Sequence, residues 1–258
     1  MNAPASGAGV PDGDGFDVRT LALGLKVGAQ LGSHRHPWGQ LVFASSGVMS
    51  VATDTEAWLV PPTKAIWLPA GVAHRITARG ELAMRTLYLG AERAAGLAAR
   101  PVALEVAPLL RELILHILAI GMLNPARPEH DRLAGLLVDL LRAARQQDLS
   151  LPLPAERRAR ELATRILDAP ADAIGLAELA DQVGASLRTM QRVFPRETGL
   201  TPEAWRQKAR LVHAVGSLCT GARVTDAAYD CGYRSVGAFI AAFARQFGVT
   251  PGRYFSGP

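Results

Sequence analysis

The chain has few of the features that would place it outside a cytoplasmic, globular class. It has 258 residues and only two cysteines, Cys219 and Cys231, so a disulfide framework cannot hold its fold together, and both thiols are expected to be buried small hydrophobes. The longest nearly unbroken apolar run, Leu113 to Leu123, is shorter than the roughly 20 residues that a bilayer-spanning helix needs. Residues 1–17 have neither a basic nor an apolar stretch, which favours a loose tail over a signal peptide.

The composition excludes disorder for most of the chain, and the excess of positive over negative charge is small. Hydrophobic residues make up 49% of the chain, enough to bury one large core or two modest ones. The net charge is +5. Residues 155–258 hold 14 Arg and Lys against 10 Asp and Glu, a balance of +4, and residues 1–154 hold 14 against 13, a balance of +1. This asymmetry fits a polyanionic partner for the C-terminal part and equally fits an ordinary solvated surface.

The hydrophobic pattern changes from strand-like to helical along the chain. Short alternating apolar segments separated by Gly and Pro run from Thr20 to Leu89, which predicts a small sandwich or barrel. From about Leu104 the period becomes helical, and two apolar stripes are joined through residues 124–128. The stripes either pack on the preceding sheet or are shared with a second subunit, and their width favours the second interpretation. They comprise Leu109, Leu110, Leu113, Ile114, Ile117 and Leu118, then Leu133, Leu136, Leu137, Leu140 and Leu141.

The C-terminal part contains an internal repeat. After a short, proline-rich linker predicted at residues 150–154, the pattern F-x-R-x-x-G-[LV]-T-P-x-x-[WY] occurs at residues 194–205 and again at 243–254. In each copy the glycine, Gly199 or Gly248, predicts a left-handed helix end, and the Thr-Pro pair predicts the start of the next helix. An amphipathic segment that ends at another glycine precedes each copy, with Ser186 or Ser235 as the expected helix cap. The sequence therefore predicts two helix-turn-helix units.

This arrangement resembles the AraC/XylS family of bacterial transcriptional regulators. The resemblance is strongest in AYDCGYRSVGAFIAAFARQFGVTP at residues 228–251, and it extends from about Glu156 to Phe255. It implies a DNA-binding domain in which a long helix, about Pro202 to Leu218, bridges the two units. Two recognition helices are then expected in successive major grooves, about 34 Å apart.

The resemblance places the first recognition helix at Leu187 to Glu197. Arg188, Gln191 and Arg192 are expected to face base edges, because Arg pairs with guanine and Gln with adenine in the major groove. The alternative is that these are solvated charges on a helix surface.

The second recognition helix lacks such side chains. At the equivalent positions it carries Val236, Gly237, Ile240 and Ala241, so we expect phosphate contacts and shape readout from this half and base discrimination mainly from the first. For Arg210 the alternative is a buried salt bridge. The remaining candidates for DNA contacts are Ser186, Thr189, Arg206, Arg210, Arg234, Ser235 and Arg253.

The N-terminal half resembles a cupin. The spacing of Gly28-x5-His34-x-His36-x3-Gln40-x6-Gly47 follows the first cupin motif, with Gln where the family usually has Glu, and Pro69-x-Gly71-x2-His74 follows the core of the second. His34 and His36 are expected on one face of a strand and to converge with His74. With Gln40 they would form a facial site for Zn, Ni, Fe or Mn. Without a carboxylate the ion keeps its positive charge, which favours an anionic or polarisable effector.

Two alternatives to a metal site follow from the same residues. The histidines can hydrogen-bond inside a sugar or aromatic pocket that holds no metal, and Trp38, Trp58 and Trp67 are candidates for lining an effector pocket or for the core. Three histidines on a barrel also suit a cupin metalloenzyme, which would need a nearby carboxylate. No motif places Glu56 or Glu81 there.

The sequence therefore predicts an α+β, effector-responsive regulator that is not an enzyme. Its predicted parts are a flexible tail (1–18), a cupin-like β-barrel sensor domain (19–95), linker helices that dimerise (96–154) and an all-α DNA-binding domain (155–258). The expected partners are a double-stranded DNA operator, a small-molecule or metal effector, a second copy of the chain and, for an activator, RNA polymerase; no membrane is expected. A constitutive regulator with a purely structural barrel is a further alternative.

Overall fold

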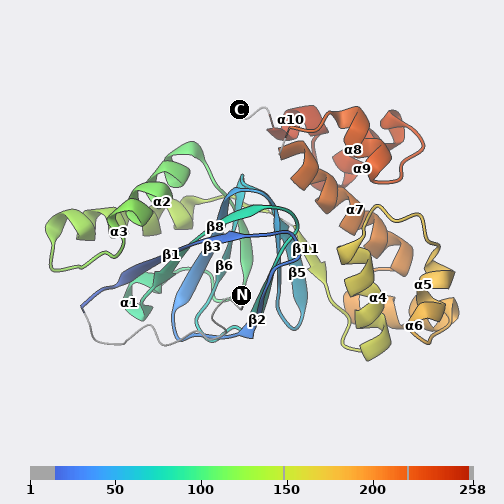
Figure 1. Cartoon of the computed structure of the whole chain (residues 1–258), viewed down its shortest axis with the longest axis horizontal. Coiled ribbons are helices and arrows are strands. Elements are labelled where there is room, and N and C mark those ends of the chain that lie inside the picture. The colour runs from blue at the N-terminus through green and yellow to red at the C-terminus, as the bar shows by residue number, and fades with distance from the viewer. Residues whose placement is uncertain (1–14, 148, 220, 256–258) are drawn as a thin grey trace. The chain divides into compact units, whose positions relative to one another are not determined.

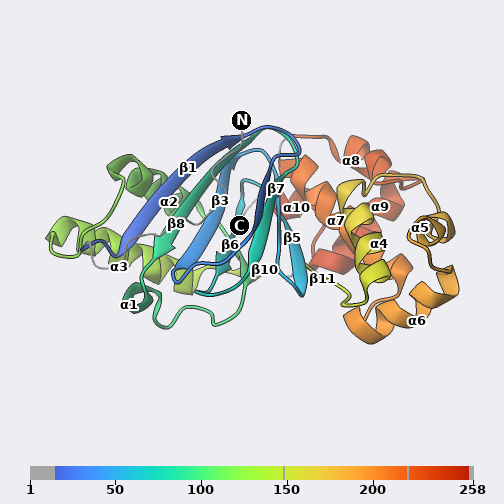
Figure 2. The same cartoon turned by 60° about the horizontal axis from the view of Figure 1, so that its bottom comes forward.

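The computed structural model describes residues 15–147, 149–219 and 221–255, so most of the predicted tail lies outside the described residues. The chain divides into two compact units. The first comprises Met1–Thr53 and Val60–Asp148, and the second comprises Asp54–Leu59 and Leu149–Pro258. Figures 1 and 2 show the strands of the first unit and the helices that make up most of the second. The predicted α+β organisation is confirmed. None of the described helices is long and apolar enough to cross a membrane.

The first unit is built on a six-stranded antiparallel sheet in the order β1-β8-β3-β6-β9-β10. In a second antiparallel sheet, β7 lies between β4 and β2. The strands of the six-stranded sheet are β1 (Val18–Leu25), β3 (Gly39–Ser46), β6 (Lys64–Leu68), β8 (Leu82–Leu89), β9 (Val102–Glu105) and β10 (Gln146–Gln147). Those of the second sheet in this unit are β2 (Gln30–His34), β4 (Met49–Ala52) and β7 (His74–Ala78).

The two faces of the six-stranded sheet have different surroundings because side chains alternate along each strand. Leu41 is paired with Trp67 and Leu87, and all three pack in one core cluster with the helices. Their neighbours Gln40 and Tyr88, which are also paired, point to the opposite face. One face of this sheet therefore carries the helices, and the other carries these polar side chains among buried apolar ones.

Helices α2 (Pro108–Ile120) and α3 (Pro128–Ala143) cover the apolar face, and the short helix α1 (Ala91–Ala94) contacts α3. The alternative that the stripes pack on the sheet, which their width did not favour, holds for Leu110, Leu113, Ile114, Ile117, Leu137 and Leu141, which are buried in that cluster. Four large apolar side chains from this segment stay exposed: Leu109 (59%), Ile120 (38%), Met122 (41%) and Leu136 (41%).

The second unit contains one strand pair and seven helices among the described residues. The predicted linker differs from the structure, because Ser150–Pro152 forms strand β11, which pairs with β5 (Glu56–Val60). The carbonyl oxygen of Pro152 accepts a hydrogen bond from Trp205 Nε1 at 2.7 Å, which ties the strand to the helices. The helices are α4 (Arg157–Asp168), α5 (Leu176–Gln182), α6 (Leu187–Thr198), α7 (Pro202–Cys219), α8 (Val224–Asp230), α9 (Val236–Phe247) and α10 (Pro251–Phe255).

Both predicted helix-turn-helix units are confirmed, as α5–α6 and α8–α9. Ser186 Oγ accepts a hydrogen bond from Thr189 N, and Ser235 Oγ accepts one from Ala238 N, each at 3.2 Å. Gly199 (φ 73°) and Gly248 (φ 78°) end α6 and α9 in the left-handed conformation. The equivalent stop and start signals therefore give two copies of the same local structure.

Cys231 behaves as a buried small hydrophobe. Its thiol donates to the carbonyl oxygen of Arg210 at 3.2 Å, and burial raises its pKa to about 12. Because only the thiolate is nucleophilic, we expect a thiol reagent at pH 8 to modify no more than one cysteine quickly in the native protein and the second only after unfolding. A Cys219→Ser variant should then show no fast reaction. Equal reaction rates for two thiols in the native protein would contradict this expectation.

Candidate metal centre and nucleic-acid interface

Three histidines converge in the first unit, beside Gln40 and Tyr88. His34, at the end of β2, lies directly opposite His74, the first residue of β7. His36 lies beyond the end of β2, where its carbonyl oxygen accepts a hydrogen bond from Gly71 N at 2.9 Å. The ring centroids are 4.4 Å apart for His34 and His74, 5.3 Å for His36 and His74 and 6.0 Å for His34 and His36. The potential ligand nitrogens all lie within 4.8 Å of one another.

The hydrogen bonds fix the same tautomer for all three rings. Each Nδ1 lies 2.8–2.9 Å from a backbone carbonyl oxygen, that of Gly32 for His34, of Trp38 for His36 and of Val72 for His74. A carbonyl oxygen can only accept, so Nδ1 carries the proton, and in the neutral ring Nε2 carries the lone pair. Metal-binding histidines are commonly held in this way.

His74 is the most constrained member of the cluster. It is 1% exposed, and its Nε2 has no hydrogen-bond partner. Burial, followed by the neighbouring His34 and His36, lowers its pKa to about 4, against the opposing hydrogen bond to Val72. The imidazole is therefore neutral at pH 7 and presents a buried, unpaired lone pair.

Gln40 adds an oxygen to the cluster. Its side chain is buried, and Nε2 donates to Thr86 Oγ1 at 2.9 Å and to Tyr88 Oη at 3.2 Å. Thr86 Oγ1 itself donates to Leu41 O, which leaves it as an acceptor for the amide and fixes the amide's orientation. Gln40 Oε1 consequently faces His36 Nε2 at 3.0 Å. With a neutral His36, two acceptors face each other there, an arrangement that a cation between them would satisfy.

The predicted metal-ligand set is thus brought together, and two further residues join it. Thr86 and Tyr88 hold Gln40 but belong to no motif; their spacing of two on a strand opposite Gln40 is the only signal that the sequence offers. The predicted placement of His34 and His36 on one strand is wrong, because β2 ends at His34. Among the described residues, the metal-binding group contains three histidines and no carboxylate.

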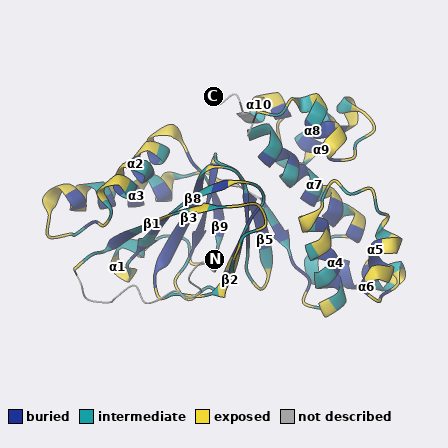
Figure 3. Ribbon diagram, viewed as in Figure 1, coloured by how far each residue is buried: buried dark blue, intermediate teal, exposed yellow. Residues whose placement is uncertain are grey.

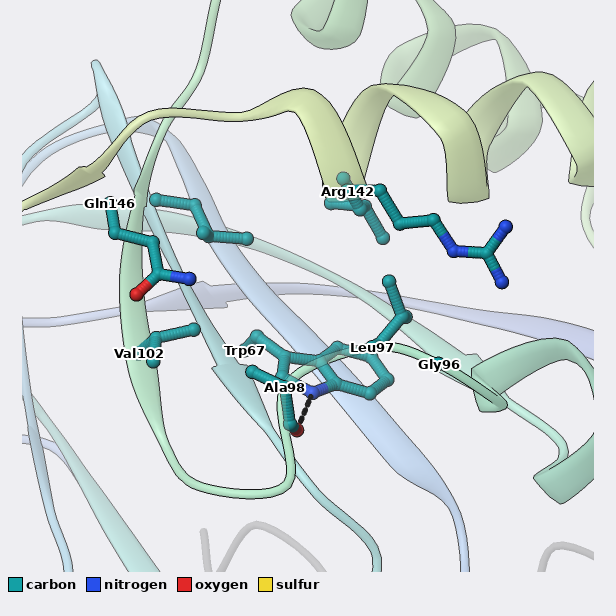
Figure 4. A pocket seen from close by; sticks show the side chains of 9 residues that line it. Trp67, Gly96, Leu97, Ala98, Val102, Arg142 and Gln146 are labelled. Carbon is teal, nitrogen blue, oxygen red and sulfur yellow. Dashed lines mark hydrogen bonds between the residues drawn. The ribbon is translucent and has the colours of Figure 1, made fainter.

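The three tryptophans have different surroundings. Trp38 lies beside the cluster, with its carbonyl oxygen bonded to His36 and the Arg19 guanidinium 5.0 Å above its ring. Trp58 is buried in β5. Trp67 does not line the histidine site, because its side chain points to the helix-covered face of the sheet. There its Nε1 donates to Ala98 O at 2.9 Å, at the edge of a cavity of about 290 Å³ (Figure 4).

The first recognition helix presents the predicted polar side chains to solvent. Arg188, Gln191 and Arg192 are exposed on α6, and Met190, Val193 and Phe194 form its buried side (Figure 3). Thr189 is half-buried, and its hydroxyl hydrogen-bonds with Ser186. The exposed face can make the bidentate contacts that distinguish bases in the major groove.

The second recognition helix differs in part from the prediction. Val236 and Ile240 are half-buried and pack on the core around Phe239 and Phe243, so only part of each side chain reaches the surface. The exposed positions are Gly237 and Ala241, as predicted, and also Ala238 and Arg245. Arg234, Ser235 and Arg253 are exposed and remain candidates for phosphate contacts.

The prediction that Arg206 contacts the DNA backbone is wrong, and Arg210 is also engaged within the protein. Arg206 is 9% exposed and donates to the carbonyl oxygens of Ile174, at 2.6 Å, and Asp172. Burial, followed by the charge of Arg210, lowers its pKa. Arg210 donates to the carbonyl oxygens of Pro170 and Asp172, each at 2.9 Å. Both side chains from α7 hold the loop that precedes α5.

Comparisons with known proteins identify a DNA-binding family and a ligand-binding family in the chain. The chain matches a helix-turn-helix domain family over residues 179–257 and an AraC-like ligand binding domain family over residues 29–163. The HTH-type transcriptional regulator NimR of Escherichia coli (strain K12) is 34% identical over 225 residues, which cover 86% of this chain and 81% of NimR. The HTH-type transcriptional activator RhaS of Escherichia coli O157:H7 is 39% identical over 82 residues, 31% of this chain and 30% of RhaS. The crystal structure of a probable AraC family transcriptional regulator from Rhodopseudomonas palustris CGA009 aligns at 29% identity with a TM-score of 0.36, over 38% of this chain and 94% of that one.

Proposed function

This chain belongs to the AraC family of transcriptional regulators, and we propose that it senses its effector through a divalent metal ion held by His34, His36, His74 and Gln40. The observation that carries this proposal is the shared tautomer of the three histidines. Their Nδ1 protons are all committed to backbone carbonyls, so three Nε2 lone pairs remain for one centre. Purely structural histidines would not need this common orientation, nor a buried Nε2 without a partner.

The donor set indicates the chemistry of the effector. Three imidazole nitrogens and one amide oxygen are neutral, and they suit Zn, Ni, Fe or Mn. A bound ion would supply an uncompensated positive charge at this site. An anionic or polarisable effector is therefore favoured over a cationic one, with Tyr88 Oη beside Gln40 as a further polar group.

The DNA-binding unit reads its operator mainly with the first recognition helix. Arg188, Gln191 and Arg192 contact base edges from α6, whereas α9 contributes a surface of Gly237, Ala238 and Ala241 that fits closely against DNA without polar readout. Arg234, Arg245 and Arg253 supply phosphate contacts near this second helix. Effector binding would shift the population that is competent to bind DNA.

We further propose that the α2–α3 segment forms the dimer interface. Leu109 and Leu136 are exposed although their neighbours on the same helices are buried against the sheet, and exposed apolar side chains of this size are typical of interfaces.

A Leu136→Glu variant is expected to shift the protein from dimer to monomer in light scattering at micromolar concentration, with its thermal midpoint little changed. Val27→Glu, a matched change at a 73% exposed apolar side chain outside these helices, should leave the mass unchanged. A Leu136→Glu variant that keeps the mass of the wild type would contradict the proposed interface.

The protein is proposed to act as a regulator without enzymatic activity, in the cytoplasm. A metalloenzyme would need an acid or base near the metal, and no carboxylate belongs to the described histidine group. The outcome at the promoter depends on where the operator lies relative to RNA polymerase, which is a partner only if the protein activates transcription.

The proposal is tested by mapping the DNA protected near the protein's own gene. We expect protection that changes when the metal-loaded protein is given small carboxylic acids, and that does not change when the His34→Ala protein receives the same compounds. Identical responses of the two proteins would show that the histidine site is not the sensor. No change with any effector would favour a constitutive regulator with a structural barrel.

A further inference from the structure

Arg210 contacts the loop before the first helix-turn-helix and the turn of the second, from the helix that joins the two. It lies near the middle of α7, which contacts α4 and α6 on one side and α8 and α9 on the other (Figure 1). Its Nε donates to Pro170 O and its Nη2 donates to Asp172 O, each at 2.9 Å. These two carbonyls belong to the loop between α4 and α5, just before the first helix-turn-helix begins.

The same guanidinium lies against the turn of the second helix-turn-helix. Gly232 (φ 75°) connects α8 to α9, and a Cβ placed there would lie 3.3 Å from each of Arg210 Cζ, Nη1 and Nη2. Because this Cβ position is equally far from three atoms of the planar guanidinium, the guanidinium lies with its flat face against the glycine. The preceding residue, Cys231, donates its thiol proton to the backbone carbonyl of Arg210 at 3.2 Å. The side chain and the backbone of Arg210 thus both engage this turn.

Arg206, one helical turn earlier, provides the internal comparison. Its guanidinium donates to Ile174 O and Asp172 O, both in the loop between α4 and α5. Arg206 therefore secures to α7 the loop that precedes the first helix-turn-helix. Arg210 contacts that loop and the turn of the second helix-turn-helix with one rigid group. Arginine suits this role because its planar fork can donate in two directions and stack at once.

We propose that Arg210 is a positioning residue that fixes the placement of α9 relative to α6 and thereby sets the spacing between DNA boxes that the chain accepts. The inference rests on the proposed function, since it requires both units to bind one DNA duplex. Inserting one base pair moves a box by about 3.4 Å and rotates it by about 34–36°. A rigid pair of recognition helices cannot follow that change, whereas a loosened pair can.

The test measures spacing tolerance as well as affinity. The probes are a two-box duplex selected from a random library with the wild-type protein, and the same duplex with one or two base pairs inserted between the boxes. The proteins are the wild type, Arg210→Met, Arg210→Lys and the control Arg157→Met, whose side chain is 81% exposed on α4. Arg210→Lys keeps the charge and provides the same readout if Arg210→Met does not fold.

We expect the wild type and Arg157→Met to lose at least about 10-fold in affinity on the inserted duplexes. Arg210→Met should bind the selected duplex about 5- to 30-fold more weakly than the wild type does. Insertion of base pairs should weaken the binding of Arg210→Met by less than about a further 3-fold. For Arg210→Lys both losses of affinity should lie between those of the wild type and Arg210→Met. Equal spacing discrimination in all four proteins, or weakening of every duplex by one common factor, would overturn the proposal. Failure of the wild type to select any DNA would instead contradict the proposed function.

Discussion

Replacing Arg192 with alanine is expected to weaken binding to the preferred operator by about 5- to 150-fold and to relax the base preference at one position. The side chain is exposed on the polar face of α6, one helical turn after Arg188. A bidentate arginine–guanine contact provides about 1–3 kcal/mol of discrimination against the wrong base. The measurement is the affinity for a set of operator variants in which each base pair is changed in turn. The variant should bind the substituted sites almost as well as the original one.

Arg234→Ala is the matched control because Arg234 lies before α9 and is a candidate for a phosphate contact. It should weaken binding to all operator variants by a similar factor and reduce the slope of log affinity against log salt by about one. If Arg192→Ala also weakened all sequences equally, Arg192 would hold only the backbone. Base discrimination would then have to come from Arg188, Gln191 or the shape of the DNA.

The small side chains on α9 make this asymmetry between the two halves a physical consequence of the sequence. Gly237, Ala238 and Ala241 have no group that can make a bidentate contact. We therefore expect the second half to contribute affinity through close approach and nearby arginines. Because the balance over residues 155–258 is only +4, we also expect tight binding to need both helix-turn-helix units and, in the proposed dimer, both subunits.

The architecture of the DNA-binding unit could be predicted because its signals are local. A serine cap, a left-handed glycine and a Thr-Pro start each act within four residues, and the repeat supplies them twice. The burial of Arg206 could not be predicted in the same way. Its carbonyl partners lie more than 30 residues away in the chain, so nothing in the helix pattern distinguishes a buried arginine from one that faces DNA.

The histidine site of the first unit could likewise be predicted only where its signals are local in the sequence. Cupin-like spacing correctly grouped the three histidines and Gln40. It did not reveal Thr86 and Tyr88, which reach Gln40 only through the pairing of β8 with β3. Of the two alternatives for Trp67, the structure supports the core, and its face follows from the pairing of β6 with β3. Strand Ser150–Pro152 was missed because its partner, β5, lies about 90 residues earlier in the chain.

Removal of the His74 imidazole is expected to abolish metal binding at the proposed centre. His74 supplies a buried, neutral nitrogen whose lone pair has no other partner, and loss of one of four ligands should cost more than the 10- to 100-fold typical of residues that merely orient a ligand. We therefore expect His74→Ala to bind Zn, Ni, Fe or Mn at least about 100-fold more weakly than the wild type. Untagged protein, stripped with a chelator and titrated with each metal in a calorimeter, provides the measurement.

Two further variants separate loss of a ligand from loss of the fold. His116→Ala removes an exposed histidine on α2 and should bind metal as the wild type does. His34→Ala removes a ligand that is only half-buried, so it should lose the metal with a smaller change in thermal midpoint than His74→Ala. Wild-type protein that binds each metal no more tightly than His74→Ala would refute the metal centre. The three aligned imidazoles would then have to serve the alternative that needs no ion, a polar pocket in which the effector itself donates to the Nε2 lone pairs.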